Sequence, residues 1–551
     1  MAIRGLRHIR MAGTMRIRSR FARRGAAFAA AAVFAGCLCA QADEPGLPHL
    51  VRKDGRHALI VDGAPFLILG AQSNNSSAWP ATLPRVWSAI ERAQANTLEV
   101  PVYWEQLEPE RGKFDYSVVD QLLSGAREHR VRLVLLWFGT WKNGSSHYLP
   151  MWLKRQPELC PRIIGRDGRR VDSPSPHSPA LLEADTRAFS ALMRHLREAD
   201  PRHTVIMVQV ENEPGSWNTV RDYSPAAQKL FTSPVPAELL KALGREGRAG
   251  GDWAAVFGRD ADEFFQAWSV ARFIGQVAAA GKAEYPLPLY VNAALRDPLT
   301  QPAASTYESG GATDNVLDIW KAAAPAVDVL APDIYMNDSE HYLKVVDLYS
   351  RPDNALFIPE TIGSAAGTRF CYAALARGAI GWSPFGIDSP NRNANAAGDA
   401  LDPIAINCRV LNPMMREVAQ WAFEGRLHAA VEESDGRQQT LALGRWQAAV
   451  AFGPATFGFG RSPKGNPEPV GRVLVAQLGE DEFMVTGYLC RVDFRAADPV
   501  SGAQRDFLRV EEGAYEGGVF HPARIWNGDE TDWGLNFGSA PQVLRVQLGT
   551  Y

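Results

Sequence analysis

The sequence predicts a (β/α)8 TIM barrel followed by a C-terminal all-β, sandwich-like domain, and two observations support this prediction. Between residues 65 and 387, eight short apolar segments rich in β-branched residues alternate with segments of helical periodicity. Parallel strands covered by helices have this composition, and eight strand–helix units in one array are typical of a closed barrel. From residue 424 onward, short alternating segments separated by glycine turns predict a β-sandwich.

Length and composition agree with an α/β protein of this size. The 551 residues are 46% apolar, as in ordinary globular proteins, and the formal net charge is −3. This near-neutral balance leaves no broad basic field for a nucleic-acid partner. We expect a signal peptide over residues 1–42, the catalytic barrel over 47–423 and the β domain over 424–551.

The first 42 residues predict export. They begin with an Arg-rich stretch that has no acid, continue with an Ala-rich run, and end in Ala40-Gln41-Ala42, which fits the small-x-small cleavage pattern. The expected location is therefore periplasmic or secreted, and the apolar run is too short for a transmembrane span. Three alternatives stay open: a twin-arginine signal at Arg23–Arg24, a lipid anchor at Cys37, and translation from Met11 or Met15.

Four further cysteines follow the signal: Cys160, Cys371, Cys408 and Cys490. They form no CxxC pair and have no His at metal-ligand spacing, so we expect no zinc site, and no metal or other cofactor. Disulfides can form in an exported protein, and Cys371–Cys408 is the pair nearest in sequence.

The elements of the barrel are expected in regular order. The eight expected strands are 65–70, 96–103, 131–138, 204–210, 288–293, 327–336, 356–362 and 379–387. The expected helices are 87–95, 118–129, 181–198, 262–280, 315–323, 342–349, 370–376 and 413–423. A hairpin over residues 49–63 leads into the barrel. Two segments interrupt the alternation: 218–260, expected to help shape the cleft, and 392–408, expected to be an exposed loop.

Two of the expected strands end in carboxylates. The run TVIMVQV at 204–210 leads into Glu211, Asn212 and Glu213, and Glu360 follows the buried residues of the seventh strand. Unpaired carboxylates are costly in a core, whereas catalytic groups of a barrel lie at the carboxyl ends of its strands. A salt bridge at the barrel rim is the alternative for either Glu taken singly.

Carboxylates that face one another across a barrel mouth suit glycoside hydrolysis. At a separation of about 5–5.5 Å the expected outcome is retention. One carboxylate then attacks the anomeric carbon. The other, with a raised pKa, protonates the leaving oxygen and afterwards activates water.

The segment Gln209-Val210-Glu211-Asn212-Glu213, followed by Gly215, resembles the Q-x-E-N-E motif of glycoside hydrolase family 35. Pro214 stands where that family usually has an aromatic residue. The family belongs to a clan of retaining (β/α)8 hydrolases. The resemblance implies that Glu213 is the acid/base, Glu360 the nucleophile and Asn212 a contact of the sugar 2-hydroxyl. It also selects Glu213 over Glu211, which spacing alone does not.

Further matches to this family extend through the barrel. Trp141-Lys142-Asn143-Gly144 resembles its W-E-N-G motif, with Lys142 in place of Glu. The resemblance implies substrate contacts for a set of residues at strand ends: Trp141, Asn143, Tyr335, Trp382 and Asn75. Glu99 on the second strand is expected either to bind a sugar hydroxyl or to pair with an arginine. Packing at the barrel rim is an equal alternative for both tryptophans.

The expected protein is thus an exo-acting retaining β-galactosidase that removes terminal β-linked galactose from oligo- or polysaccharides. The β-rich tail resembles the bacterial branch of family 35, some members of which act on xyloglucan side chains. Two alternatives remain: a retaining glycosidase of the same clan, such as a β-glucanase or mannanase, and a non-catalytic carbohydrate-binding barrel. The oligomeric state stays open.

Overall fold

The computed structural model describes residues 46–389, 402–454, 462–498 and 504–551. The predicted signal over 1–42 lies outside these described residues. Within those ranges, no helix has the length and apolar character that crossing a membrane requires.

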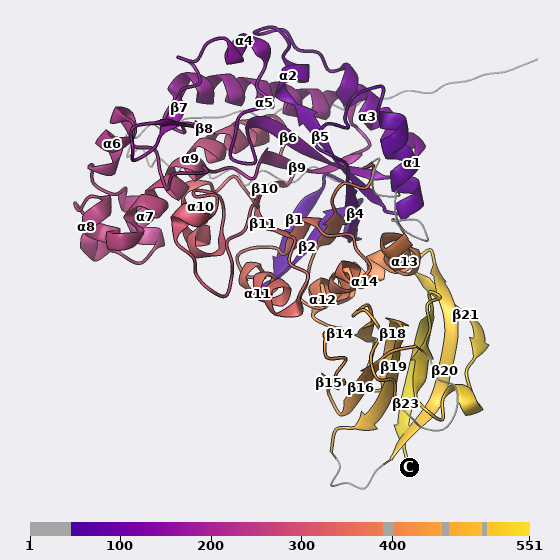
Figure 1. Ribbon diagram of the computed structural model, residues 1–551. Coiled ribbons are helices and arrows are strands. Elements are labelled where there is room, and N and C mark those ends of the chain that lie inside the picture. The colour runs from indigo at the N-terminus through magenta and orange to yellow at the C-terminus, as the bar shows by residue number, and fades with distance from the viewer. Residues whose placement is uncertain (1–45, 390–401, 455–461, 499–503) are drawn as a thin grey trace, which may run out of the picture. The chain divides into compact units, whose positions relative to one another are not determined.

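Eight parallel strands close into a barrel, which confirms the predicted fold class (Figure 1). The ring closes where β13 pairs with β4, with Gly381 opposite Ile68. The strands, in order around the barrel, are β4 (Ile68–Gln72), β5 (Thr97–Tyr103), β6 (Arg132–Lys142), β9 (Val205–Asn212), β10 (Leu289–Ala293), β11 (Val329–Ile334), β12 (Phe357–Thr361) and β13 (Gly381–Pro384).

Helices follow the barrel strands along the chain and form the outer layer (Figure 1). The helices of this layer are α1 (Leu83–Ala93), α3 (Ser117–Glu128), α5 (Pro179–Ala199), α9 (Ala261–Glu284), α10 (Leu317–Ala323), α11 (Ser339–Tyr349), α12 (Phe370–Leu375), α13 (Asp402–Leu411) and α14 (Met415–Glu424). Two one-turn helices, α2 (Trp104–Leu107) and α4 (Met151–Lys154), lie in the loops after β5 and β6.

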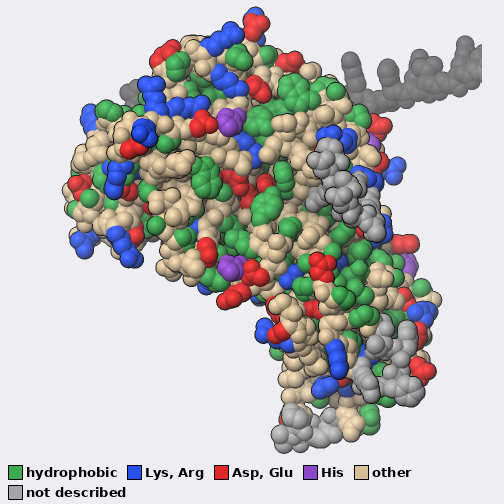
Figure 2. Space-filling view, viewed as in Figure 1, with side chains coloured by type: hydrophobic (Ala, Val, Ile, Leu, Met, Phe, Trp, Pro, Cys, Tyr) green, Lys and Arg blue, Asp and Glu red, His purple; other side chains and the backbone are tan. Residues whose placement is uncertain are grey.

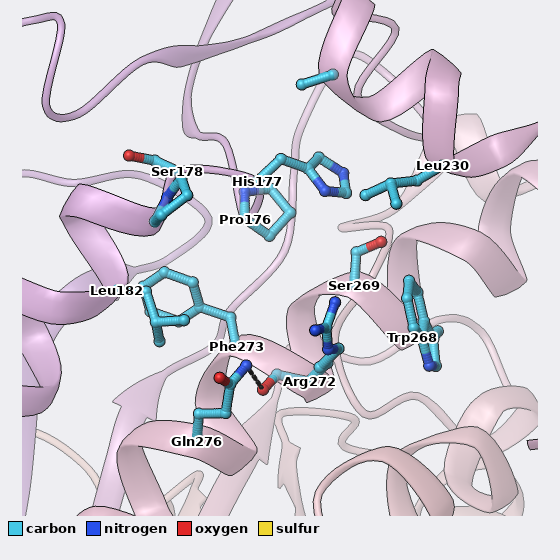
Figure 3. A pocket seen from close by; sticks show the side chains of 12 residues that line it. Pro176, His177, Ser178, Leu182, Leu230, Trp268, Ser269, Arg272, Phe273 and Gln276 are labelled. Atoms are coloured by element: carbon cyan, nitrogen blue, oxygen red, sulfur yellow. Dashed lines mark hydrogen bonds between the residues drawn. The ribbon is translucent and has the colours of Figure 1, made fainter. Parts of the chain in front are cut away.

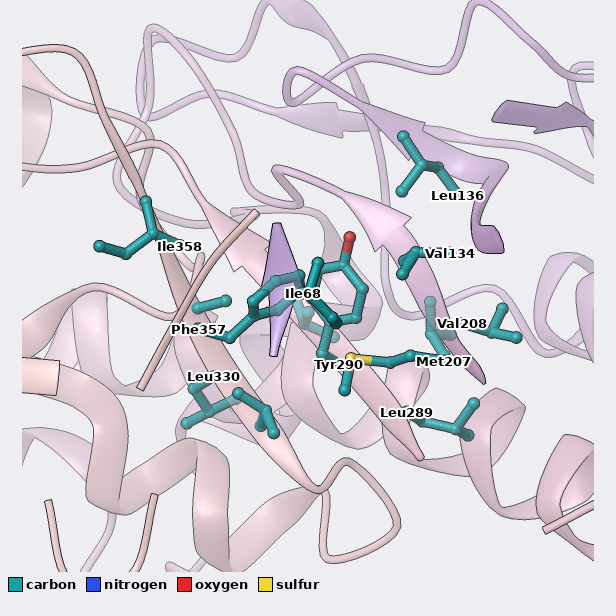
Figure 4. Close-up of a cluster of buried hydrophobic side chains, with 14 of the residues drawn as sticks. Ile68, Val134, Leu136, Met207, Val208, Leu289, Tyr290, Leu330, Phe357 and Ile358 are labelled. Atoms are coloured by element: carbon teal, nitrogen blue, oxygen red, sulfur yellow. The ribbon is translucent and has the colours of Figure 1, made fainter. Parts of the chain in front are cut away.

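The inside of the barrel is a packed hydrophobic core. Figure 4 shows side chains such as Ile68, Met207, Tyr290 and Phe357 meeting there from different strands. Because each strand is buried on both faces, its sequence is an almost continuous apolar run, and this made the strands recognisable. A filled interior leaves the strand ends and their loops as the place for a binding site.

The first predicted strand needs a correction. Ala64–Phe66 forms β3, which pairs with β2 (Arg56–Val61), and β2 pairs in turn with β1 (His49–Lys53). The expected hairpin over 49–63 is therefore part of a three-stranded antiparallel sheet, and the barrel strand β4 begins only at Ile68.

The two interrupting segments also differ from a plain loop. Segment 218–260 contains three short α-helices, α6 (Pro225–Phe231), α7 (Ala237–Ala242) and α8 (Trp253–Phe257), and two 3₁₀ helices, Glu246–Arg248 and Gly258–Asp260. Elsewhere, a small hairpin of β7 (Arg162–Ile164) and β8 (Arg170–Pro174) precedes α5. The prediction of an exposed loop over 392–408 is wrong for its described part. Residues 402–411 form α13, which buries Ile404, Cys408 and Leu411. The remainder of that segment lies outside the described residues.

The C-terminal part consists of antiparallel sheets, as predicted. The six-stranded sheet contains β14 (Leu427–Val431), β17 (Arg472–Gln477), β18 (Glu482–Tyr488), β23 (Val543–Thr550), β20 (Arg505–Glu516) and β21 (Val519–Ile525). The four-stranded sheet contains β15 (Gln439–Leu443), β16 (Trp446–Phe452), β19 (Cys490–Ala496) and β22 (Leu535–Phe537). Residues of both sheets share one hydrophobic core, the arrangement of a sandwich.

Buried polar contacts join the last barrel helices to the β domain. The Arg472 guanidinium on β17, almost fully buried, donates from Nε to Asn407 Oδ1 of α13 at 2.9 Å. Arg369 donates from Nε to the Glu432 carbonyl, also at 2.9 Å. The predicted boundary at 423/424 thus has hydrogen bonds across it.

The suggested Cys371–Cys408 disulfide is not formed. Buried free thiols are found at Cys160, Cys371, Cys408 and Cys490.

Candidate active site

Three carboxylates meet at the carboxyl ends of the barrel strands. They are Glu213 directly after β9, Asp333 on β11 and Glu360 on β12; each is buried and offers an oxygen within 4.8 Å of the other two. Asp333 and Glu360 stand opposite one another in the pairing of β11 with β12. The two predicted glutamates are therefore brought together, and their neighbour Asp333 was not predicted.

Two donors orient the Glu360 carboxylate. The Tyr335 hydroxyl donates to Oε1 at 2.5 Å, and the Gln72 side-chain amide donates to Oε2 at 3.1 Å. Tyr335 follows β11 and was among the expected substrate contacts, whereas Gln72 ends β4 and was not predicted. Because each oxygen has a fixed donor, the carboxylate has one defined orientation toward the barrel mouth.

The backbone at the end of β9 is irregular, and this sets the direction of Glu213. Glu211 and Glu213 both have left-handed backbone conformations, with φ of 64° and 41°. Non-glycine residues rarely adopt these, and such strain is concentrated at functional sites. The Asn292 side chain holds the strained segment: its Oδ1 accepts from the Glu213 N–H at 2.8 Å, and its Nδ2 donates to Asp333 Oδ2 at 2.6 Å.

The electrostatic surroundings of Glu213 favour the protonated form of its carboxyl group. Burial, and then the nearby Glu360 charge, raise the pKa of Glu213 to about 6, while Lys142 acts in the opposite direction. Burial, together with Glu360 and Glu213, also raises the pKa of Asp333 well above its usual range. Three anions this close repel one another strongly, so the group holds protons that separate carboxylates would release.

The second carboxylate of the motif, Glu211, points elsewhere. It is fully buried, and its Oε2 accepts from the Trp141 N–H at 2.6 Å. Burial and the adjacent Asp185 raise the pKa of Glu211 well above its usual range. Asp185 lies on α5 and also accepts from Trp137 Nε1 at 2.9 Å. Glu211 is thus bound to the end of β6 and lies beside Asp185 of the helix layer, and its Oε1 has no partner among the described residues.

Asn212 lies in the site with its side chain unpaired. It is fully buried, and neither its amide nitrogen nor its amide oxygen has a hydrogen-bond partner among the described residues. A buried amide without partners is unfavourable unless a ligand supplies them. Asn212 is therefore free to bind a hydroxyl group, the role that the family resemblance implied.

The other predicted contact residues have different surroundings. Trp141 is fully buried and meets Phe273 of α9 edge-on at 5.0 Å, and Trp382 is buried with its Nε1 donating to Tyr342 on α11 at 3.0 Å. Both rings thus pack against side chains of the helix layer. Glu99 lies in the barrel interior, where its Oε2 accepts from the Tyr290 hydroxyl at 3.3 Å and its Oε1 has no partner, arginine included, among the described residues.

Two predicted residues lie in the loops beside the strand ends. Asn143 is exposed, has a left-handed φ of 52°, and accepts a hydrogen bond from the Lys142 ammonium group. Asn75 is half-buried; its side-chain oxygen has no partner within the described part of the chain, and its carbonyl accepts from the Tyr148 hydroxyl at 3.3 Å. On the face shown in Figure 2, acidic and hydrophobic side chains are grouped near the middle of the barrel region.

The three carboxylates are also the one described group of acids, histidines or cysteines whose spacing could hold a metal ion. Carboxylate oxygens suit hard cations. Shared protons offer another way to reduce the repulsion, and the raised pKa values of Glu213 and Asp333 favour this. A cavity of about 320 Å³ lies between α5, α6 and α9 (Figure 3). It is lined by His177, Trp268 and Arg272 among others, and the three carboxylates are not part of its lining.

We expect Asp333→Asn to stabilise the protein at neutral pH. The folded-state pKa of Asp333 is raised, so the folded protein binds this proton more tightly than the unfolded chain does. Stability is therefore lost as the pH rises above the unfolded value near 3.8. Removing the charge should raise the free energy of unfolding by on the order of 1 kcal/mol at pH 8.

Thermal unfolding of both proteins at pH 4 and pH 8 measures this effect. The difference in Tm should be present at pH 8 and shrink toward pH 4, where the wild-type carboxyl is protonated. Asp338→Asn is the control at an exposed position: although desolvation acts the other way, a hydrogen bond from the His341 N–H lowers the pKa of Asp338, so no gain is expected. A lower Tm of Asp333→Asn at pH 8 would contradict the repulsion described above.

Comparison with known proteins shows which families the chain resembles. Residues 76–264 match the family model Glyco_hydro_42, described as "Beta-galactosidase", and residues 405–538 match one described as "Domain of unknown function (DUF5597)". The first range includes Glu213 and ends before Glu360. It supports the expected glycoside hydrolase class, but assignment to family 35 is not confirmed, and family 42 fits better.

Individual relatives cover a limited part of the chain. A "Beta-galactosidase" of Xanthomonas manihotis is 28% identical over 196 residues, which are 33% of this chain and 29% of that protein. The "Beta-galactosidase-1-like protein 3" of Homo sapiens is 28% identical over 200 residues, 34% of this chain and 27% of that protein. The chain thus matches less than a third of either relative's length. A β-galactosidase structure from Bacillus circulans sp. alkalophilus has a TM-score of 0.47 at 14% identity, covering 64% of this chain and 57% of that one.

Proposed function

We propose that this chain is an exo-acting retaining β-galactosidase that removes terminal β-linked galactose from oligo- or polysaccharides. The observation that supports this most is the pair Glu213 and Glu360, whose oxygens lie within 4.8 Å of one another in unlike surroundings. Retaining glycosidases hold their two carboxyl groups about 5–5.5 Å apart, whereas inverting enzymes need roughly 6.5–9.5 Å for a water molecule. The family 42 match supports the same class of reaction.

In the first step, Glu360 is the nucleophile. One of its oxygens forms a bond to the anomeric carbon while the bond from that carbon to the leaving oxygen breaks. Glu213 transfers its proton to the leaving oxygen, which departs as an alcohol. Gln72 and Tyr335 keep the Glu360 carboxylate in position, and Asn212 offers its unpaired amide to a sugar hydroxyl.

In the second step, Glu213 is the base. After losing its proton it lies as a carboxylate beside the glycosyl–Glu360 ester, which no longer carries a charge. It removes a proton from a water molecule whose oxygen attacks the anomeric carbon, and the ester bond breaks. Two inversions give a product with the original β configuration.

A panel of 4-nitrophenyl glycosides tests the proposal, with NMR used to follow the anomer that forms first. We expect the β-galactoside to be hydrolysed and β-galactose to appear before the equilibrium mixture. A preference for β-glucoside or β-mannoside would favour the clan relatives of other specificity. Initial release of α-galactose would contradict the retaining mechanism, and binding without hydrolysis would favour the non-catalytic barrel.

Two finer proposals concern the substrate and the location. Galactose side chains of xyloglucan are the proposed natural substrate, tested by release of galactose from xyloglucan oligosaccharides. Export through the segment over residues 1–42 is tested by the N-terminus of the mature protein. Cleavage after Ala42 is expected; a lipid on Cys37 would identify the lipoprotein alternative.

A further inference from the structure

Two loops beyond the predicted catalytic pair are paired with one another. Ser216, in the loop after β9, donates from its N–H to the Ser309 carbonyl at 2.8 Å, and Ser309 donates back at 3.1 Å. This short antiparallel bridge brings Glu308, in the loop after β10, against the segment that follows Glu213. A side chain added at Gly215 would meet Glu308 Cγ at 2.8 Å.

Glu308 is a buried carboxyl group without a partner. Its relative exposure is 2%, and neither oxygen has a hydrogen-bond partner among the described residues. Burial, and then the Glu213 charge, raise the pKa of Glu308 well above its usual range, with Lys142 opposing them. A buried acceptor that is left unpaired is costly, so two such oxygens at the edge of a binding site indicate that a ligand supplies their donors.

An exposed aromatic ring lies beside this carboxyl group. Trp217, one residue after the bridge, is 43% exposed, which is unusual for so large an apolar side chain. A side chain added at Gly144 would overlap both the Glu308 carboxyl group and Cδ1 of Trp217. Both groups therefore lie next to Gly144, in the loop after β6. Gly144 has a left-handed φ of 66°, and because it has no side chain it leaves the space between the two groups open.

We propose that Trp217 and Glu308 form a subsite for the sugar on the leaving-group side of the scissile bond. The indole face suits stacking against the apolar face of a pyranose ring, and the carboxyl oxygens suit its hydroxyl groups. The leaving-group side follows from the neighbours: Glu308 lies near Glu213, the proposed proton donor to the leaving oxygen. Gln72 and Tyr335 surround Glu360 instead.

This inference rests on the proposed function and makes it more specific. The substrate would be galactose linked to another sugar, rather than galactose linked to a small alkyl or aryl group. The same subsite would hold a sugar that accepts the galactosyl group from Glu360 in place of water.

The test compares two substrates that differ in the leaving group. A β-linked galactosyl disaccharide fills the subsite, whereas β-galactosyl fluoride, whose leaving group is one atom, does not. We expect Trp217→Ala to lower kcat/KM for the disaccharide about tenfold, and Glu308→Gln roughly 10- to 100-fold. Both variants should keep kcat/KM for the fluoride within about twofold of wild type. Trp533→Ala, at an equally exposed tryptophan in the β domain, is the control and should change neither value.

Equal losses on both substrates, or no loss on either, would overturn the subsite. A wild type that cleaves neither substrate would instead refute the proposed function. Calorimetric binding of the disaccharide then tests the subsite alone: Trp217→Ala should weaken binding about tenfold, and equal affinity of variant and wild type would exclude the subsite.

Discussion

Glu360→Gly is expected to abolish turnover of β-galactosides, with kcat lower by on the order of 10⁴-fold or more. The expected loss is this large because Glu360 is the carboxylate that Gln72 and Tyr335 hold in position to form the ester. Added azide should restore cleavage of an activated aryl β-galactoside by entering the space of the missing carboxylate. The product should be the α-galactosyl azide, since azide attacks from that side in a single displacement.

The matched control is Glu340→Gln, an exposed glutamate at the start of the neighbouring helix α11. It should keep wild-type kcat. A Glu360→Gly variant that turns over at more than a few percent of the wild-type rate, or that yields the β-azide, would remove Glu360 from the role of nucleophile.

Glu213→Ala is expected to show a loss that depends on the leaving group. General acid catalysis contributes about 10²- to 10⁴-fold, so a β-galactosyl disaccharide should lose that much in kcat/KM. A dinitrophenyl galactoside, whose leaving group needs no proton, should form the galactosyl–enzyme at a rate close to wild type and then accumulate it. Azide should release this intermediate as the β-galactosyl azide.

The pH dependence gives an independent measure of the same role. A general acid must be protonated, and the pKa of Glu213 is raised to about 6. The wild-type kcat/KM for the disaccharide should therefore decline as the pH rises through about 6, and this decline should be absent in Glu213→Ala. Glu211→Gln is the sharpest comparison, because Glu211 contacts β6 and not the site. Glu211→Gln should alter Tm and leave unchanged the way kcat/KM depends on the leaving group. If Glu211→Gln instead changed that dependence and left Tm unchanged, Glu211 would take the acid/base role in place of Glu213.

The strands could be predicted because they are buried on both faces, which leaves near-continuous apolar runs. Strand ends were then identifiable wherever polar residues interrupt a run, as at Glu213 and Glu360. The side on which such a residue projects was not predictable. Spacing treats Glu211 and Glu213 alike, whereas the left-handed backbone at both positions sends one to the helix layer and one to the mouth.

Other site residues had weaker local signals. Asp333 stands within the apolar run of β11 and becomes notable only next to Glu360 across the strand pair. Glu308 lies in a loop without periodicity, and its position depends on the Ser216–Ser309 bridge between residues 93 positions apart. Trp141 and Trp382 were equally compatible with stacking and with packing; their environments are those of packing. Helix α13 was missed because its neighbours in sequence are polar, although its own apolar residues face inward.

The buried Arg472 has a consequence for the order in which the chain is made. Its guanidinium needs Asn407 of α13 as an acceptor, and Asn407 precedes it by 65 residues. A nascent chain that has just completed the barrel strands therefore carries a helix whose polar partner has not yet been synthesised. The hydrogen bond between Asn407 and Arg472 can form only once β17 is present, so a barrel truncated before the β domain lacks this contact on α13.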